Sequence, residues 1–167
     1  SRGLGDVYKR QGMKRLFDLI FSFLLLIVLS PFFIFVGILI KITSKGPIIY
    51  SQERLGYMGK PYWIYKFRSM IANAEEKSGP VWASDDDPRV TPIGRILRKY
   101  RIDELPQLIN VLKGEMSLVG PRPLFQEDSG YFDKKYMRRL NVMPGMTGLL
   151  QINERNTDDF EIWYKYD

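Results

Sequence analysis

Two side chains that carry much of enzyme chemistry are absent from this 167-residue chain, which contains no cysteine and no histidine. Without cysteine, disulfides, thiolate nucleophiles and zinc–sulfur sites are all excluded. Without histidine, the chain lacks the usual general base and the commonest ligand of transition metals. Acid–base or nucleophilic chemistry must therefore come from Asp, Glu, Lys, Tyr, Ser or Thr. Any metal would be a hard cation held by oxygen atoms, Mg²⁺ before Zn²⁺.

Negative charge is also scarce. The chain has 19 acidic and 25 basic residues, a formal net charge of +6 and a sequence pI near 9.5. A basic chain of a length that suits one domain is expected to bind anionic partners. These are nucleic acid, acidic lipid or phosphorylated small molecules.

One long apolar run dominates the first part of the chain. Residues 16–40 read "LFDLIFSFLLLIVLSPFFIFVGILI" and hold a single charge, Asp18. At about 1.5 Å per residue, a straight helix of this length spans the roughly 30 Å of bilayer hydrocarbon. The run is too long for a cleaved signal peptide, and no small-residue cleavage site follows it. The sequence therefore predicts a membrane-bound protein.

A Ser-Pro pair, Ser30 and Pro31, divides this run. Proline removes one helix hydrogen bond and clashes with the preceding turn. The two pieces, at about 22 Å and 15 Å, are each too short to cross the bilayer alone. A helix broken here could enter one leaflet and return, with the Ser30 hydroxyl bonded to a freed carbonyl. A proline-kinked spanning helix is the open alternative.

Basic residues flank the run on both sides. Lys14 and Arg15 precede it, and Lys41 and Lys45 follow it. Because positive residues favour the cytoplasmic side, an even balance gives no support for a crossing and fits two cytoplasmic ends equally well.

The chain divides into three parts. Residues 1–12 match nothing around them in pattern, and we interpret them as a scar of cloning or sequencing, with the natural start at Met13. Residues 13–45 form the membrane segment, and residues 46–167 form the domain that follows it. The last stretch, "EIWYKYD", has no helix stop signal, so we expect the C-terminus to be truncated.

After the apolar run, "GPIIYSQERLG" and "KPYWIYKFRSM" are typical of two strands joined by a glycine-containing turn, a small β-hairpin. In the second strand Ile64, Lys66 and Arg68 share one face, and the aromatic residues Trp63, Tyr65 and Phe67 pack on the other. The two basic side chains could bind phosphate, or they could form a solvated face.

A basic amphipathic helix is predicted next. Thr91 is a typical N-cap, and Pro92 suits the first helical position. In "IGRILRKYRI" the apolar residues recur at helical spacing, and Arg95, Arg98 and Lys99 lie on the opposite face. Such a helix could lie at the headgroup level of a membrane or pack on the core with solvated arginines.

Asp103 and Glu104 open the stretch "DELPQLINVLKG", whose apolar spacing predicts a helix that stops at Gly114. One interpretation is that Asp103 caps this helix and Glu104 complements its dipole. The other is chemical. The helix N-terminus, Arg98 and Arg101 would keep the carboxylate ionised near neutral pH. An anionic carboxylate is a competent nucleophile toward phosphorus when cations neutralise the phosphate.

Arg122 stands between two prolines, Pro121 and Pro123, in "SLVGPRP". Each proline fixes its own φ and restricts the residue before it. An arginine that is already set in place binds phosphate with a smaller ordering cost. A rigid surface turn is the alternative.

Taken together, these stretches resemble the bacterial sugar-transferase family, the small monotopic phosphoglycosyl transferases. The matching motifs cover about residues 13–156 in the order in which the family has them. They are "KRLFDLI…LSPFFI", "GPIIYSQERLG", "IYKFRSM", "RVTPIGRILRKYRIDELPQLINVLKGEMSLVGPRP" and "PGMTGLLQIN".

The resemblance implies transfer of a phospho-sugar from a UDP-sugar to polyprenyl (undecaprenyl) phosphate, with release of UMP. This reaction begins lipid-linked glycan assembly at the cytoplasmic face of the bacterial inner membrane. The implied partners are therefore the UDP-sugar, the polyprenyl phosphate and membrane lipid, with no nucleic acid. The implied fold is α+β and mainly helical, with interfacial amphipathic helices, the small β-hairpin and a monotopic, re-entrant helix broken at Ser30-Pro31.

The resemblance also assigns residues. Asp103 would be the nucleophile that forms an aspartyl phospho-sugar, with Mg²⁺ bound at Asp103, and Glu104 would assist proton transfer. A second set would lie near phosphate or nucleotide: Arg98, Pro121, Arg122, Pro123, Arg155, Lys66 and Arg68.

Two other functions stay open. The chain could be a membrane-tethered basic binding module for acidic lipid or a partner protein, in which Asp103 is only a cap. It could also be an enzyme in which the lipid phosphate attacks directly and Asp103 only holds the metal.

Overall fold

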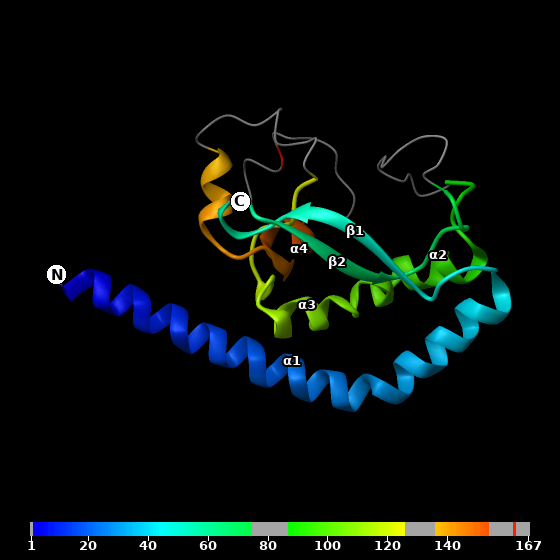
Figure 1. Cartoon of the computed structure of the whole chain (residues 1–167), viewed down its shortest axis with the longest axis horizontal. Helices are drawn as coiled ribbons and strands as arrows, with labels where there is room; N and C mark the ends of the chain where they lie inside the picture. The colour runs from blue at the N-terminus through cyan, green and yellow to red at the C-terminus, as the bar shows by residue number, and fades with distance from the viewer. Residues whose placement is uncertain (1, 75–86, 126–135, 154–161, 163–167) are drawn as a thin grey trace.

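The structure is a computed structural model that describes residues 2–74, 87–125, 136–153 and 162, with side chains from Gln11 onward except that of Tyr136. It is mainly helical with two small sheets, so the expected α+β class is confirmed. Figure 1 shows a long helix, α1, running beneath the remaining elements. The β1–β2 hairpin and the short helices α2 and α3 lie on one side of this helix.

Helix α1 runs from Arg2 to Thr43. Its stretch from Gln11 to Thr43 is long and apolar enough to cross a membrane by length and composition, and only 17% of the most apolar window is buried within the protein. Figure 1 shows the helix as two arms that meet at a bend in its central part. Pro31 lies inside the helix, and proline is a common cause of such bends.

The expected break at Ser30-Pro31 is a bend within one continuous helix, which corrects the prediction of two separate pieces. Proline at position 31 deprives the Ile27 carbonyl of its usual donor. The Ser30 hydroxyl donates to that carbonyl instead, at 2.8 Å, so the predicted hydroxyl bond is confirmed. Because this bond replaces the lost one, the helix continues on both sides.

Strand β1 (Ile49–Leu55) pairs antiparallel with β2 (Pro61–Phe67) around a short 3₁₀ turn, η1 (Tyr57–Gly59), which confirms the hairpin. The faces differ from the prediction. Tyr62 and Ile64 are buried, whereas Trp63 is 53% exposed. Val111 and Met116, from later in the chain, pack on the Ile64 face, whereas the aromatic face is open at Trp63 and closed at Phe67, which is 3% exposed.

Helix α2 (Pro92–Lys99) begins as the sequence predicts, since the Thr91 hydroxyl accepts from the Gly94 amide at 3.0 Å. Its apolar stripe is divided. Leu97 is buried in a cluster with the second arm of α1, but Ile96 is 52% exposed and Tyr100 is 65% exposed. Half of the stripe therefore packs on the protein and half is left open.

The helix predicted to start at Asp103 starts later. Residues Ile102–Glu104 form a 3₁₀ turn, η2, and α3 spans Gln107–Lys113, with Pro106 at the cap position and no side-chain cap bond. Asp103 as an N-cap is therefore wrong. The turn is tight because Ile102 packs into the α1–α2 cluster and the Leu105 amide donates to the Ile102 carbonyl at 3.2 Å. Gly114, with φ of 85°, ends α3 as expected.

A second, parallel sheet joins β3 (Ser117–Val119) to β4 (Gly145–Thr147). The 3₁₀ helix η4 (Tyr136–Asn141) precedes β4, and α4 (Leu149–Asn153) follows it. A Cβ atom on Gly145 would collide with the backbone of Gly120, so glycine permits the close approach of the two chain segments. This contact holds the segment after β3 against β4.

Candidate active site

The acid pair sits in a turn that the packing of its neighbours fixes. Arg101 adopts a left-handed conformation, with φ of 55°, and reverses the chain between α2 and η2. The Glu104 amide then donates to the Arg101 carbonyl at 3.2 Å. Asp103 is 8% exposed, and the side chain of Glu104 is 16% exposed. Both carboxylates are thus largely withdrawn from water.

Glu104 is held as an anion. Its Oε1 atom accepts from Lys66 Nζ at 2.9 Å, and its Oε2 atom lies 3.6 Å from the Arg101 guanidinium. Burial raises the pKa of Glu104, but Lys66 and then Arg122 and Arg101 outweigh it and hold the pKa at about 2. The carboxylate is therefore ionised throughout the neutral range.

At Asp103 burial outweighs the neighbouring cations, the reverse of Glu104. Burial raises the pKa of Asp103 above its ordinary value, and the negative charge of Glu104 adds to this effect. Lys66 and Arg98 oppose the shift without overcoming it. Of the groups expected to keep Asp103 ionised, the helix N-terminus is not there, since Asp103 lies in a 3₁₀ turn, and Arg98 does lower the pKa but burial outweighs it.

A hollow opens at Glu104, with a volume of about 290 Å³ that includes space open to solvent, and Asp103 lies next to it without lining it. Its lining combines three cationic side chains, one anionic side chain and two amide side chains with residues of β4. The residues are Arg54, Ile64, Lys66, Glu104, Gln107, Arg122, Pro123, Gly145, Met146 and Gln151. This excess of positive charge suits a ligand that carries phosphate.

Arg122 reaches the hollow from a segment that backbone bonds hold at both sides. The Pro121 carbonyl accepts from the Gly145 amide at 2.8 Å, and the Arg122 carbonyl accepts from Arg139 at 2.6 Å. Pro123 contributes to the lining itself, whereas Pro121 contributes through its carbonyl. The arginine between two prolines is therefore brought to the acid pair.

Arg54 is a site residue that sequence reasoning missed. It is 7% exposed, its guanidinium lies 3.2 Å from the centre of the Phe125 ring, and it donates to Gln52 Oε1 at 2.9 Å. The hairpin register pairs Arg54 with Tyr62 and Gln52 with Ile64, so it belongs to the inner face. Alternation along the strand places Arg54 and Gln52 on one face, but only the pairing with β2 shows that this face is the inner one.

Gln107 and Gln151 were also missed. Both are buried and both line the hollow, and the Gln151 carbonyl accepts from Arg101 at 3.2 Å. Gln107 lies one helical turn beyond Glu104, a spacing that could have identified it. Gln151 comes from α4, and nothing in the local sequence links that segment to the acid pair.

The remaining predicted residues lie elsewhere. Arg68 is buried and donates to the Ser44 carbonyl and hydroxyl and to the Lys45 carbonyl, so it ties β2 to the end of α1. Arg98 is half-buried and acts on the charge of Asp103 without lining the hollow. Arg155 lies outside the described residues.

A magnesium ion fits these residues only when it shares its ligands with a substrate. No three Asp or Glu side chains gather as a metal-binding group in the part of the chain that the structure describes. Both oxygens of Glu104 face cations, so Asp103 is the carboxylate that could take a metal. Mg²⁺ is commonly held by one or two carboxylates with phosphate oxygens and water. The donor set therefore suits Mg²⁺ bound jointly with a diphosphate.

Comparison with known proteins assigns most of the chain to one family. Residues 9–167 match the family described as bacterial sugar transferase. A Bacillus subtilis (strain 168) protein, provisionally named an undecaprenyl-phosphate N-acetylgalactosaminyl 1-phosphate transferase, is 48% identical over 86% of this chain and 76% of its own length.

Two longer relatives match over a smaller share of their length. The undecaprenyl-phosphate galactose phosphotransferase of Salmonella typhimurium (strain LT2) is 42% identical over 91% of this chain and 36% of its own. The UDP-glucose:undecaprenyl-phosphate glucose-1-phosphate transferase of Klebsiella pneumoniae is 47% identical over 84% of this chain and 30% of its own.

Proposed function

The chain belongs to the bacterial sugar transferase family, and on that basis we propose that it is a phosphoglycosyl transferase. It moves a phospho-sugar from a UDP-sugar to polyprenyl (undecaprenyl) phosphate, releases UMP and so begins assembly of a lipid-linked glycan. The relatives support the acceptor, since all three are named for undecaprenyl phosphate, and the Klebsiella protein is named for a UDP-sugar.

The observation that carries the proposal is a cationic hollow lined by Glu104, directly beside its buried neighbour in sequence, Asp103. Lys66 and Arg122 line the hollow together with Glu104. Phosphoryl transfer needs little covalent chemistry from a protein beyond positioning and neutralisation of charge. A site without histidine can provide both.

In the first step, an oxygen of the Asp103 carboxylate attacks the sugar-bearing phosphorus of the donor. The bond from that phosphorus to the bridging oxygen breaks, and UMP leaves with the electron pair. Burial favours this attack because a carboxylate that has lost its water shell is a stronger nucleophile, and Asp103 is 8% exposed. Mg²⁺ shared by Asp103 and the diphosphate would neutralise charge at the donor.

In the second step, an oxygen of the lipid phosphate attacks the aspartyl phospho-sugar, and Asp103 leaves as a carboxylate. Glu104 accepts the proton of the lipid phosphate. With its pKa near 2, Glu104 is too weak a base for this while Lys66 and Arg101 hold it. Phosphate groups that enter the hollow compete for these cations, and the pKa of Glu104 then rises toward the working range.

We also propose that α1 is re-entrant and that the catalytic domain lies on the cytoplasmic face of the inner membrane. The first arm of α1 contacts β3 through Asp18, and the second arm packs Val36 and Ile40 against Leu97. A spanning helix would separate its two ends by about 30 Å of hydrocarbon. One domain could not then contact both arms.

Exposed apolar residues support the same placement. Ile96 and Tyr100 on α2 and Ile109 on α3 are exposed, as are many side chains along α1. Exposed apolar area of this extent usually marks an interaction surface. If these short helices lie at the headgroup level, membrane lipid covers their exposed apolar side chains.

The direct test of the function is Asp103→Asn. The amide keeps the size of the side chain but is no nucleophile, so Mg²⁺-dependent release of UMP from a UDP-sugar with polyprenyl phosphate should fall by about 10³-fold or more. Glu53→Gln, an exposed carboxylate outside the hollow, is the matched control and should keep normal turnover. Near-normal transfer by Asp103→Asn would refute the role of Asp103.

A second measurement separates the mechanisms. Incubation of the protein with a UDP-sugar alone should leave a phospho-sugar on Asp103, detected by mass spectrometry, with one UMP per adduct. Normal turnover without an adduct would favour direct attack by the lipid phosphate. Absence of UMP release across a panel of UDP-sugars would favour a binding module.

A further inference from the structure

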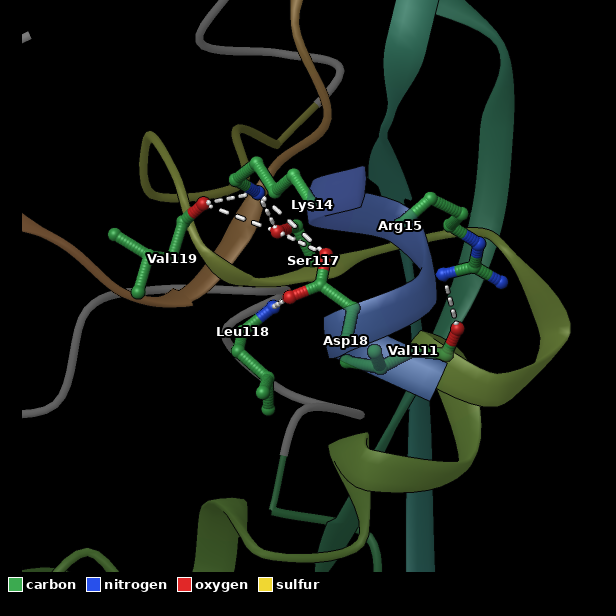
Figure 2. Close-up of polar contacts among 7 residues, drawn as sticks. All are labelled: Lys14, Arg15, Asp18, Val111, Ser117, Leu118 and Val119. Carbon is green, nitrogen blue, oxygen red and sulfur yellow. Dashed lines mark hydrogen bonds and ion pairs between the residues drawn. The ribbon is translucent and has the colours of Figure 1, made fainter. Parts of the chain in front are cut away.

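Asp18, the one charge in the apolar run, is buried in a contact with the catalytic domain. Asp18 is only 4% exposed. Its Oδ2 atom accepts from the Ser117 hydroxyl at 2.7 Å, and its Oδ1 atom accepts from the Leu118 amide at 3.3 Å. Figure 2 shows the carboxylate turned toward the segment that holds both donors, which is β3. A carboxylate in a membrane helix carries a large free-energy cost, so such a residue is a candidate for a functional role.

Lys14, one turn earlier on the same helix, completes this contact. Its ammonium lies 3.5 Å from Asp18 Oδ2, and it donates to the Val119 carbonyl at 3.0 Å and to the Ser117 hydroxyl. Figure 2 shows Lys14 and Asp18 on the same side of the helix around Ser117. Three consecutive residues of β3 are therefore held by two side chains of α1.

Arg15 extends from the helix in another direction and holds a second element. Its guanidinium donates to the Val111 carbonyl at 2.7 Å (Figure 2). It also donates to the Leu112 carbonyl at 3.3 Å. These carbonyls belong to the last turn of α3, where that of Val111 also accepts from the capping Gly114 amide at 3.1 Å. A cation at this end of a helix also complements the helix dipole.

The two elements held in this way both lead to the hollow. From β3 the chain continues through Gly120, whose amide donates to the Thr147 carbonyl at 2.9 Å, to Arg122 in the lining. At the opposite end of α3, Gln107 and the preceding Glu104 belong to the same lining. The first arm of α1 thus contacts two of the segments that place charged groups around the hollow, while the β1–β2 hairpin supplies the others.

We propose that Asp18 is a positioning residue for the Arg122 side of the active site. The carboxylate fixes β3 against the membrane helix and thereby sets where Arg122 meets the phosphate of the donor. This inference rests on the proposed function. A displacement of about 1 Å in a catalytic group can lower a rate by up to about 10²-fold, so a contact four residues from Arg122 is close enough to matter.

The test is a double-mutant cycle of Asp18→Ala with Arg122→Lys. In the wild-type background, Asp18→Ala leaves the Leu118 amide and Lys14 without this carboxylate, and kcat/KM should fall by 10- to 100-fold. In the Arg122→Lys background, the same change should lower kcat/KM by less than about threefold, because the group that it positions is already altered. An equal loss in both backgrounds, or no loss in either, would overturn the proposal.

Controls separate positioning from folding. Thr43→Val removes a hydroxyl bond of 2.6 Å to the Leu39 carbonyl at the far end of α1 and should leave kcat/KM unchanged. If Asp18→Ala yields no folded protein, Ser117→Ala replaces it in the cycle, since it removes one of the two bonds to the carboxylate. It should lower kcat/KM by about three- to tenfold with the same lack of additivity.

Amide hydrogen exchange gives a readout that needs no activity. Asp18→Ala should speed exchange in the peptide covering residues 117–122 by about tenfold and leave β1–β2 unchanged. Unchanged exchange there would refute the contact. If the wild type shows no transfer, the proposed function fails while exchange still tests the contact. Transfer by the wild type with additive losses refutes the inference alone.

Discussion

At the scale of single residues, Asp103 and Glu104 are neighbours in one turn whose surroundings move their pKa values apart. Lys66, Arg122 and Arg101 outweigh burial at Glu104 and hold its pKa at about 2, whereas burial prevails at Asp103 and raises its pKa. Two carboxyl groups treated so differently suit two different roles. In our proposal the desolvated one attacks phosphorus, and the ion-paired one organises the cations until phosphate takes them.

The pH dependence of kcat/KM tests this division. The nucleophile must be ionised, and a raised pKa keeps Asp103 protonated to a higher pH, so kcat/KM should fall on acidification through that pKa. Lys66 lowers the pKa of Asp103. Lys66→Met should therefore move the acidic limb of the profile to higher pH, besides weakening donor binding. Lys113→Met, at a surface pair with Glu115, should leave the limb in place. A limb that does not move in Lys66→Met would show that another group controls it.

Local sequence could identify some site residues and not others, for physical reasons. Arg122 between its prolines and the acid pair itself stand out because their neighbours along the chain restrict them. Arg54 depends on which residues pair across the hairpin, and Gln151 depends on a tertiary approach that no short stretch encodes. Asp103 as a cap was wrong because Asp before an apolar run is equally compatible with a 3₁₀ turn. The burial of Ile102 decides between them.

At the scale of elements, the bend of α1 is the feature on which the arrangement depends. Pro31 leaves the Ile27 carbonyl without its helical donor, and the Ser30 hydroxyl supplies one. The sequence predicted this bond but also predicted two separate helical pieces. Because the hydroxyl bond replaces the lost one, α1 instead stays one continuous helix with a bend. The bend lets the first arm contact β3 while the second arm packs against α2.

Pro31→Ala should straighten the helix. It restores an N–H for the Ile27 carbonyl and removes the clash of the ring, so the two arms can no longer both contact the domain. We expect a membrane-bound protein whose transfer rate falls by at least about tenfold, with faster amide exchange in residues 117–122. Pro92→Ala is the matched control, because proline at the first position of α2 removes no helical bond. Full activity of Pro31→Ala would mean that the bend does not depend on proline.

At the scale of the whole molecule, the length of the apolar run could not decide its path. Residues 16–40 are long enough to cross a bilayer and are also able to bend back within it, and the flanking charges balance. What favours re-entry is that both arms of α1 contact one catalytic domain through residues far apart in sequence, such as Asp18 with Ser117 and Val36 with Leu97. Contacts of that kind depend on the folded chain, and composition does not report them.

The absence of cysteine makes this topology directly measurable, because every introduced thiol is unique. Gln11→Cys and Lys45→Cys place one thiol on each side of the apolar run, both at exposed positions. In a re-entrant arrangement, a maleimide that cannot cross membranes should label both in inverted inner-membrane vesicles and neither in intact spheroplasts. Val28→Cys, 73% exposed in the apolar run, should resist labelling in both preparations because lipid covers it. Labelling of Gln11→Cys and Lys45→Cys from opposite sides would require a spanning helix. The contacts of both arms with one domain would then have to break in the membrane.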